Sequence, residues 1–583
     1  PTTEEFPLVL TTGRIRDQWH TMPKTGKVNK LNQHISEPYL EIHPNDAAAL
    51  DIAEGELVQI INPDSQSKIK ATITDSIKQG TVFAPMHWGR IFNSIEARAN
   101  NLTTFKVDPT SKEPDFKFSA VKVSKITQEP KKIIIVGAGA SRLEFIHSYR
   151  AMNAQDEIHV FAKEPHLFYN RILLPDYINE DKSWDSLLSS NDEELASLNI
   201  HFHQGTAIDT IDKDTRHITD SNGTTHSYDK LILATGSRPA QPMPVPENMQ
   251  GIFGLRTKQD ADAIMAYLKA GETATIVGGG LLGLELAGAL NSIGIKVTIL
   301  QRSNSLMRGQ LDALGAEILH EEVENRGIKV LFDEEVERIE DKQGDGKVDN
   351  LVLKSGKQLP TKGLFFAAGI KPNIEIAINA GIDYGRGVQV NDQLQTSDPY
   401  IYAMGEIAEH RELTYGTTPA AQDQARILAR SLNGDIYAHY EGSLSFNVLK
   451  IPQLELCSIG IIDKPEGKEY QEITMLDRHS NYYKKCILKH DRLIGAILIG
   501  DKSEFSEFKT LIEQGLELAD KRQTLLRGGG KPAEQAIGPI ICSCNNVGEG
   551  NITNAIAKGC DQFEELCSLT NAGTGCGSCR PEV

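Results

Sequence analysis

The stretch 274-ATIVGGGLLGLELA-287 joins an apolar, strand-like run to a glycine-rich turn and then to a helix-like run. Gly278, Gly280 and Gly283 fill the three glycine positions of a dinucleotide-binding turn, and Glu285 follows them. Glycines let the backbone approach a diphosphate closely, and the helix N-terminus adds N–H groups and a positive dipole end. We therefore expect a parallel α/β fold here, with these four residues at a bound dinucleotide.

The next strand-like run, 296-KVTILQR-302, bears on which nicotinamide dinucleotide is bound. It ends in Gln301-Arg302, where sites selective for NAD usually place an acidic residue. A basic side chain at Arg302 suits the 2′-phosphate of NADPH, so the sequence favours NADPH over NADH.

A second turn of this kind lies in 133-IIIVGAGASR-142. Gly137 and Gly139 follow an apolar run, but Arg142 stands where the third glycine is expected. The strand-like run after it ends in Glu164, which is placed to accept a ribose hydroxyl. Taken alone, this stretch could also be a βα turn without a ligand. Together, the two turns predict two dinucleotides in one α/β region.

Composition and charge restrict the classes of partner. The 583 residues are 39% hydrophobic and 24% charged, a balance that supports several domains with buried cores. The formal net charge of −18 disfavours a nucleic-acid partner. No apolar run is long enough for a membrane span and no secretory leader is visible. We expect a cytoplasmic protein without a membrane partner, although a fragment that begins at Pro1 could have lost a leader.

The order of apolar runs predicts four segments. Short apolar runs between Gly, Pro, Asn and Asp are typical of a β-barrel or sandwich, whereas alternating strand and helix patterns are typical of a parallel sheet. The segments are a β-rich domain at 1–126, an α/β domain at 131–435 whose second nucleotide-binding part covers about 252–365, a mixed α+β domain at 440–527, and a small cysteine-bearing domain at 538–583.

Two close pairs of cysteines near the end of the chain, in 541-ICSC-544 and 575-GCGSCR-580, suggest a metal site. They supply Cys542, Cys544, Cys576 and Cys579. Four thiolates at this spacing suit zinc or an iron–sulfur cluster. A zinc knuckle is the alternative, and we favour a cluster because zinc cannot exchange electrons. The remaining cysteines, Cys457, Cys486, Cys560 and Cys567, are expected to be buried packing residues.

Three stretches resemble motifs of flavoproteins that bind two dinucleotides. The stretch 231-LILATGSRP-239 is similar to their ATG motif, and 396-TSDPYIYAMGE-406 resembles their second flavin motif, with Glu406 in place of the usual Asp. The stretch 168-FYNRILLPDY-177 resembles the flavin-facing segment of nitrite reductase flavoproteins. The resemblance implies that FAD contacts Gly137, Gly139, Glu164, Arg171, Thr235, Gly236, Gly405 and Glu406.

The region from 131 to about 527 thus resembles the FAD/NAD(P)H module of the large subunit of assimilatory nitrite reductase. No cysteine pair lies near the first nucleotide fold, so a disulfide reductase mechanism is not expected. The spacing of Cys542, Cys544, Cys576 and Cys579 resembles the bacterioferritin-associated-ferredoxin-like domain. That resemblance implies a 2Fe-2S cluster as the acceptor of the flavin's electrons.

The N-terminal segment resembles a third family. The stretches 10-LTTGRIRDQWHTMPKTGKV-28, 37-EPYLEIHPNDAAALDIAEGELV-58 and 100-NNLTTFKVDPTSKEPDFKFSAVKV-123 are similar to the molybdopterin-dinucleotide-binding domain of molybdenum nitrate reductases and their formate dehydrogenase relatives. Met86 replaces an aromatic residue of that family, so its role in substrate access is open. The resemblance implies cofactor contacts from Thr12, Gly13, Arg14, Trp19, His20, Thr21, Asn100 and Lys117.

These resemblances imply the C-terminal portion of an assimilatory nitrate reductase. Electrons would pass from NAD(P)H to FAD, to the 2Fe-2S cluster and to molybdenum-bis(molybdopterin guanine dinucleotide), where nitrate is reduced to nitrite. No molybdenum ligand or 4Fe-4S motif is recognisable, so both are expected upstream of Pro1 and the catalytic residue is unknown. The alternatives are the flavoprotein arm of a nitrite reductase, a formate dehydrogenase-like molybdoenzyme, and a non-enzymatic scaffold with vestigial sites.

Overall fold

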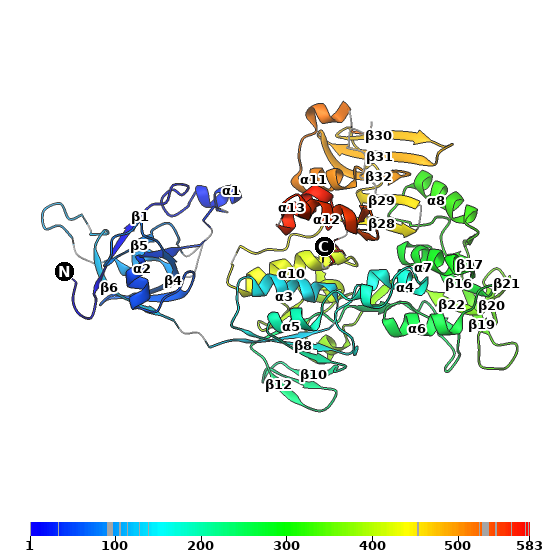
Figure 1. Ribbon diagram of the computed structural model, residues 1–583, viewed down its shortest axis with the longest axis horizontal. Helices are drawn as coiled ribbons and strands as arrows, with labels where there is room; N and C mark the ends of the chain where they lie inside the picture. The colour runs from blue at the N-terminus through cyan, green and yellow to red at the C-terminus, as the bar shows by residue number, and fades with distance from the viewer. Residues whose placement is uncertain are drawn as a thin grey trace. The chain divides into compact units, whose positions relative to one another are not determined.

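The computed structural model describes the chain apart from residues 1, 33, 36, 90–96, 104–106, 114, 127–128, 138, 436, 452–453, 524, 527–535, 543–544, 561, 576, 578 and 581. The described residues form two compact units, Pro1–Pro130 and Lys131–Val583 (Figure 1). None of the described helices is long and apolar enough to cross a membrane.

The first unit is a closed β-barrel. Buried and partly exposed residues alternate along β1 (Leu8–Gly13), because successive side chains of a strand point to opposite faces. Aliphatic side chains such as Leu10, Val58 and Val82 fill the interior. The strands pair in the order β1, β5 (Thr81–Pro85), β2 (Tyr39–Ile42), β4 (Gln66–Ile73), β3 (Leu57–Ile61) and β6 (Ser119–Lys125), with helices α1 (Asn29–Asn32) and α2 (Pro44–Ala49) in the connections.

The second unit begins with a parallel five-stranded sheet. Its central strand, β7 (Lys132–Val136), is apolar and almost wholly buried because both faces of the sheet are covered. Helices α3 (Ala140–Arg150) and α10 (Thr418–Leu432) cover one face. The antiparallel strands β10 (Ile208–Asp212), β11 (His217–Asp220) and β12 (Thr225–Ser227) pack on the other. The strand order is β25 (Ile401–Ala403), β13 (Lys230–Leu233), β7, β8 (Glu157–Ala162) and β9 (Ile200–Gln204).

A second parallel sheet follows, and its central strand β16 (Thr273–Val277) leads into α7 (Leu281–Ser292) through the glycine turn. Its strand order is β15 (Ile252–Phe253), β22 (Gly363–Phe366), β16, β17 (Lys296–Gln301) and β18 (Lys329–Phe332). The smaller elements around the two sheets are α4 (Leu174–Ile178), α5 (Asp192–Ser197), α6 (Lys258–Tyr267), α8 (Ala313–Asn325), α9 (Glu375–Asn379), β10 (Ile208–Asp212), β11 (His217–Asp220), β12 (Thr225–Ser227), β14 (Ser237–Pro239), β19 (Val336–Glu340), β20 (Asn350–Leu353), β21 (Gln358–Pro360), β23 (Ile370–Pro372), β24 (Val388–Val390), β26 (Ala408–His410) and β27 (Leu413–Thr414).

An antiparallel sheet with α11 (Phe505–Gln514) and the cysteine-bearing segment end the chain. The sheet order is β28 (Phe446–Ile451), β29 (Leu454–Gly460), β32 (Arg492–Ile499), β31 (Tyr482–Lys489) and β30 (Tyr470–Asp477). The cysteine-bearing segment contains β33 (Ile540–Cys542), β34 (Val547–Gly548), α12 (Glu549–Ala557) and α13 (Phe563–Thr570).

The antiparallel sheet and the cysteine-bearing segment share one hydrophobic core. Phe505 and Phe508 of α11 belong to the same buried cluster as Val547, Leu566 and Cys579. The predicted fold class, a β-barrel followed by a two-nucleotide flavoprotein fold and small C-terminal domains, is confirmed.

Lys484 on β31 supports the core of this C-terminal sheet. Its buried ammonium donates to Asp501 at 2.7 Å and also to Glu504. Burial by itself lowers the pKa of Lys484, but the hydrogen bonds to these carboxylates outweigh burial and raise it. We expect Lys484→Ala to lower the free energy of unfolding by about 3 to 5 kcal/mol, because Glu504 would stay buried without its cation.

Denaturant unfolding followed by circular dichroism measures this loss. Lys468→Ala, at an exposed position, is the control and should leave the free energy of unfolding nearly unchanged. A loss below about 1 kcal/mol for Lys484→Ala would show that the ion pair does no more than an exposed one.

Candidate functional site

The first glycine turn is shaped to admit a diphosphate. Gly137 has φ +125°, and a Cβ built on it would lie 2.0 Å from the carbonyl oxygen of Ala234. Gly139 begins α3, and no atom lies within 4 Å of the place where its Cβ would be. The turn is therefore closed by β13 on one side and open at the N-terminus of α3 on the other, which fits the diphosphate of FAD.

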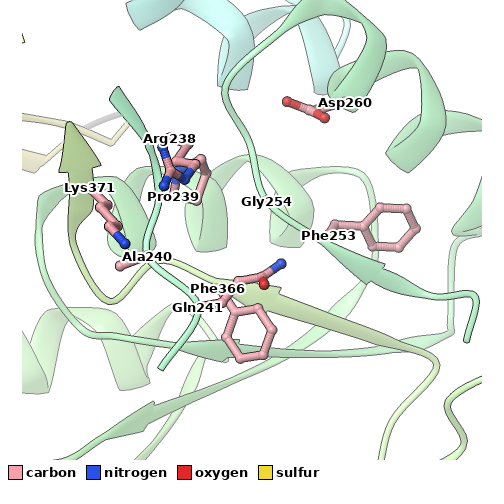
Figure 2. Close-up of a pocket in the computed structure, with 9 residues that line it drawn as sticks. All are labelled: Arg238, Pro239, Ala240, Gln241, Phe253, Gly254, Asp260, Phe366 and Lys371. Carbon is pink, nitrogen blue, oxygen red and sulfur yellow. The ribbon is translucent and has the colours of Figure 1, made fainter. Parts of the chain in front are cut away.

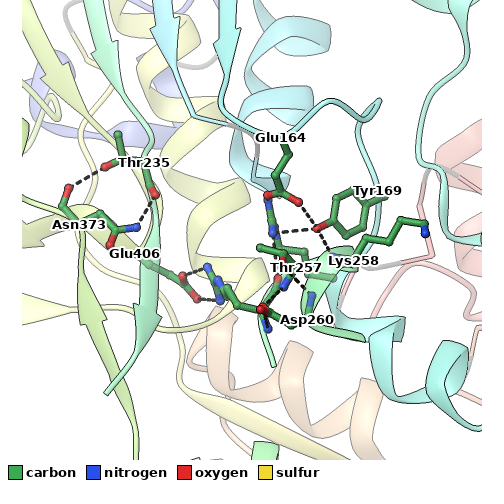
Figure 3. Close-up of polar contacts among 10 residues, drawn as sticks. Glu164, Tyr169, Thr235, Thr257, Lys258, Asp260, Asn373 and Glu406 are labelled. Atoms are coloured by element: carbon green, nitrogen blue, oxygen red, sulfur yellow. Dashed lines mark hydrogen bonds and ion pairs between the residues drawn. The ribbon is translucent and has the colours of Figure 1, made fainter. Parts of the chain in front are cut away.

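Glu164, expected at a ribose hydroxyl of FAD, and Arg171, another expected FAD contact, bind each other in this structure (Figure 3). Arg171 donates to Glu164 at 2.5 Å and to the hydroxyl of Tyr169 at 2.9 Å, and that hydroxyl donates to Glu164 at 2.6 Å. Burial, followed by the Glu164 hydrogen bond, raises the pKa of Tyr169. The carboxylate and the guanidinium are thus held at the end of β8, satisfied by each other.

Arg142, which replaces the third glycine, is fully buried. None of its three guanidinium nitrogens has a hydrogen-bond partner among the described residues. The guanidinium lies over the ring of Phe168 at 4.2 Å from the ring centre, with Phe202 at 5.9 Å. Burial, followed by repulsion from Arg171, lowers the pKa of Arg142 well below its ordinary value. The sequence showed the missing glycine but not this unpaired cation.

A second carboxylate network surrounds Glu406. Ser237 donates to Glu406 at 2.7 Å. Arg256 forms an ion pair with the same carboxylate, which Figure 3 shows as dashed lines at Glu406. Gly236 has φ +65°, and Thr235 donates to the backbone oxygen of Asn373 at 2.8 Å. The predicted flavin motifs around 235 and 406 are therefore brought together.

Arg256 is a residue of this site that sequence reasoning missed. It stands in 254-GLRT-257, just before the capping box that Thr257 and Asp260 form at the start of α6. The sequence pattern that could have identified Arg256 is a basic residue directly before the helix cap. Its backbone oxygen also accepts a hydrogen bond from Arg171 at 2.9 Å, which links the two carboxylate networks.

The second glycine turn repeats the geometry of the first. Gly278 has φ +116°, and a Cβ on it would lie 2.5 Å from the carbonyl oxygen of Ala367. A Cβ on Gly283 would lie 2.0 Å from the carbonyl oxygen of Gly278, whereas Gly280 is open. This turn fits the diphosphate of a nicotinamide dinucleotide.

Two of the polar residues around the second turn, Glu285 and Gln301, bind backbone N–H groups, whereas Arg302 is exposed. Glu285 is buried and accepts the backbone N–H of Lys450 at 3.1 Å, so its carboxylate joins α7 to β28. Gln301 accepts the N–H of Gly279 at 2.8 Å and thereby holds the turn. Arg302, beside it, is exposed and remains the candidate for a 2′-phosphate.

A cavity of about 440 Å³ lies beside the nucleotide sheet (Figure 2). Phe253 and Phe366, the last residues of β15 and β22, line it together with the cations Arg238 and Lys371. Ligands of open parallel sheets bind outside the carboxyl ends of the strands, so the cavity is in the place expected for part of a nicotinamide dinucleotide. Sequence reasoning singled out none of these four residues.

Two of the four predicted cluster ligands are described. Cys542 and Cys579 are buried, and the backbone N–H of Gly573 donates to the Cys579 sulfur at 3.2 Å. Such N–H···S bonds are typical of cluster thiolates. Cys544 and Cys576 lie outside the described residues. Among the described residues, no group of three or more His, Cys, Asp or Glu side chains is arranged to hold a metal.

The remaining cysteines are all buried. Cys560 and Cys567 lie in the cysteine-bearing segment, while Cys457 and Cys486 lie in the antiparallel sheet, where burial raises the pKa of both thiols. Their environment agrees with packing rather than reactive roles.

The barrel brings several of the expected pterin contacts together. Lys117 donates to the backbone oxygen of Thr12 at 2.6 Å, and the Thr12 hydroxyl donates to the backbone oxygen of Phe116 at 2.6 Å. Buried His87 accepts the N–H of Ile15 at 2.9 Å and also contacts the backbone oxygen of His20. These bonds fix both ends of the segment 12–20.

The other predicted pterin contacts surround this segment. A Cβ on Gly13 would lie 2.8 Å from the ring of Phe83. Arg14 lies over the ring of Trp19 at 5.1 Å, and Trp19 is 54% exposed. Thr21 and Asn100 are exposed. An ordered backbone with exposed basic and aromatic groups fits a large anionic cofactor.

Four protein-family models match the chain. The model described as pyridine nucleotide-disulphide oxidoreductase matches residues 131–425. The others are the molydopterin dinucleotide binding domain at 8–120, the rubredoxin NAD+ reductase C-terminal domain at 446–516 and the BFD-like [2Fe-2S] binding domain at 540–583.

Curated relatives match over 78% of the chain. They include a nitrite reductase [NAD(P)H] and an assimilatory nitrate reductase electron transfer subunit, both of Bacillus subtilis (strain 168) and 33% identical over 464 and 459 residues, respectively. The nitrite reductase (NADH) large subunit of Escherichia coli (strain K12) is 32% identical over 476 residues. The chain spans 57%, 59% and 54% of the lengths of these three relatives.

Solved structures share the flavoprotein fold. Reduced CoADR-RHD of Bacillus anthracis superimposes with a TM-score of 0.61 at 26% identity, over 68% of this chain and 76% of that one. NADH:rubredoxin oxidoreductase of Clostridium acetobutylicum gives a TM-score of 0.54 at 27% identity, over 66% and 95% of the two chains.

Arg142 generates a prediction about stability. Replacing it with Met removes a buried, unpaired charge and keeps the length of the side chain, so the flavin-free protein should gain about 1 to 3 kcal/mol in free energy of unfolding. Arg142→Lys keeps the charge and should gain nothing. Thermal and denaturant unfolding of flavin-free protein measure the difference, and a less stable Arg142→Met protein would contradict the unpaired state.

Arg302 generates a prediction about nucleotide choice. Arg302→Ala should lower kcat/KM for NADPH by about tenfold or more, because a hydrogen bond to a charged group contributes about 1.5 to 3 kcal/mol. The value for NADH should stay nearly unchanged. Arg308→Ala removes another exposed arginine of the same loop and serves as the control. Wild-type protein that uses NADH as well as NADPH would refute the role of Arg302.

Proposed function

This chain belongs to the pyridine nucleotide-disulphide oxidoreductase family, and we propose that it is the electron-supplying part of an NAD(P)H-dependent assimilatory nitrate reductase. The observation that carries the proposal is the order of domains. A molydopterin dinucleotide binding domain precedes a nicotinamide flavoprotein and a [2Fe-2S] binding domain in one chain. A relative named as an assimilatory nitrate reductase electron transfer subunit supports the assignment.

The absence of a disulfide favours the cluster as the electron acceptor. Residues 131–425, which match the disulphide oxidoreductase family, contain no cysteine. A protein of this family without a cysteine pair beside the flavin must pass electrons elsewhere. Buried Cys542 and Cys579, in a segment that shares a core with the flavoprotein's C-terminal sheet, offer that acceptor.

The chain's own residues would bind and orient the cofactors. Gly137, Gly139 and the start of α3 would hold the diphosphate of FAD. Glu164 and Glu406 would accept hydroxyl groups of the adenosine ribose and the ribityl chain after exchanging their bonds to Arg171 and Arg256. Both arginines would then be free to meet the diphosphate, which replaces the two carboxylates as their counter-ion.

The other proposed contacts complete the electron route. Gly278, Gly280, Gly283 and Arg302 would hold NAD(P)H, and the cavity lined by Phe253 and Phe366 would take part of the same dinucleotide. Cys542, Cys544, Cys576 and Cys579 would hold the 2Fe-2S cluster. The proposed pterin contacts are Thr12, Gly13, Arg14, Trp19, His20, Thr21, Asn100 and Lys117.

The cofactors would supply the redox chemistry. When bound, FAD would supply the conversion between hydride transfer from NAD(P)H and one-electron transfer to the cluster, and the molybdenum cofactor would supply the two-electron chemistry of nitrate reduction to nitrite.

A second candidate is the flavoprotein arm of a nitrite reductase. The B. subtilis relative named nitrite reductase [NAD(P)H] supports it, with 33% identity over 464 residues. The barrel at 8–120 argues for nitrate reductase instead, because the pterin-binding domain would have no use in a flavoprotein arm.

The proposal is tested with the full-length gene product and Cys579→Ser. Wild-type protein should form nitrite from nitrate with NADPH and should contain iron. Cys579→Ser should lose NADPH-driven nitrite formation but keep both NADPH–ferricyanide activity and nitrate reduction driven by a reduced viologen, because only the link between flavin and molybdenum is broken. Lys558→Ala, an exposed change on the same segment, is the control. Stoichiometric zinc without iron, or consumption of nitrite instead of nitrate, would overturn the proposal.

A further inference from the structure

Helix α10 contacts a flavin motif on one face and the cysteine-bearing segment on the other. Gln424 accepts the backbone N–H of Gly405 at 2.7 Å, and Ala421 lies 3.9 Å from the place where a Cβ of Gly405 would be. The amide oxygen of Gln422 lies 2.6 Å from the corresponding place on Gly577. Because helical residues are about 100° apart around the axis, Gln422 and Gln424 point to nearly opposite sides.

Helix α11 also contacts the cysteine-bearing segment, at Thr574. Lys509 donates to the backbone oxygen of Thr574 at 3.3 Å, and the hydroxyls of Ser506 and Thr574 are 3.3 Å apart. Asn545, next to predicted ligand Cys544, donates to the Thr574 hydroxyl at 2.9 Å. The loop 573–577 is therefore tied both to α11 and to the other ligand-bearing loop.

The shared hydrophobic core makes this arrangement a fixed one. Leu566 and Ala572 of the cysteine-bearing segment are buried together with Phe446, Phe505 and Phe508. A segment joined only by a flexible tether would keep a core of its own. Burial of these side chains in common fixes the segment on the sheet that adjoins α10.

Gly577 is the contact point between the loop and α10. It lies between predicted ligands Cys576 and Cys579 and has φ +72°, a conformation that favours glycine. The atoms within 4 Å of its missing Cβ that lie nearest all belong to Gln422. A Cβ at 577 would thus collide with the amide oxygen of Gln422 unless that side chain or the loop shifted.

We propose that α10 is the wall shared by the flavin site and the cluster loop, and that the contact between Gln422 and Gly577 positions the cluster ligands for electron transfer from the flavin of the same chain. The proposal rests on the proposed function for the identity of the two redox groups. Gln422 acts as a positioning residue and takes part in no bond change. The contact adds no chemical step to the route.

A double-mutant cycle on the full-length protein tests the contact. Gln422→Ala removes the amide, Gly577→Ala crowds it, and the double variant gives the added methyl group the space that the amide leaves. Gly559→Ala is the matched control, because Gly559 has φ +98° in the same segment and no atom within 4 Å of its missing Cβ. It imposes comparable backbone strain away from α10.

Stopped-flow spectra with NADPH separate flavin bleaching from the later reduction of the cluster. Flavin bleaching should match the wild type in all variants. Reduction of the cluster should slow in each single variant by clearly more than about twofold, the spread expected for a change that does not act through the contact. The double variant should recover part of the rate, and Gly559→Ala should match the wild type.

Hydrogen exchange of the backbone amides of 418–424 provides a readout independent of turnover. Exchange should speed up in Gln422→Ala and Gly577→Ala but not in Gly559→Ala. Cluster reduction within about twofold of the wild type in both single variants, or unchanged exchange, would overturn the proposal. Wild-type protein without iron or flavin would refute the proposed function, and exchange at 418–424 would still decide the contact.

Discussion

The closeness of two glycine turns to the neighbouring strand is the constraint on which the flavoprotein part depends. Gly137 is pressed against the carbonyl of Ala234, and Gly278 against that of Ala367, at distances that leave no room for a Cβ. Each turn ends a buried strand and starts a helix whose N-terminus stays open. The two parallel sheets are built around these turns, and every proposed dinucleotide contact is arranged relative to them.

The side chains around the two glycine turns differ in charge and in their partners. At the first, carboxylates and guanidinium groups satisfy each other through the Glu164–Arg171 and Glu406–Arg256 pairs, while Arg142 is buried on aromatic rings with no partner among the described residues. At the second, a neutral amide, Gln301, holds the turn and Arg302 stays exposed.

The cysteine-bearing segment owes its place to hydrophobic burial. A segment of this size has little core of its own, so the core shared with α11 and the antiparallel sheet stabilises it and fixes its position together. The same burial brings Gly577 to α10, on the opposite side from Gly405. Stability and the spacing of redox groups therefore depend on the same side chains.

The sequence alone determined the local chemistry of the chain. Glycines at fixed spacing after apolar runs predicted the α/β fold and both nucleotide turns, because only glycine permits the close approach that such turns require. Short apolar runs between Gly, Pro, Asn and Asp predicted a β-barrel or sandwich. Cysteine spacing predicted a metal site, of which Cys542 and Cys579 are described and buried.

The sequence did not predict contacts between residues far apart along the chain. Only the tertiary structure decided that Arg256 pairs with Glu406 and that Glu285 bonds to β28. It also decided that Arg142 is buried on Phe168 and Phe202 and that Gln422 contacts Gly577. The reason is physical: periodicity and spacing act along the chain over a few residues, whereas the partner of a buried charge or amide is set by which strands and helices pack together.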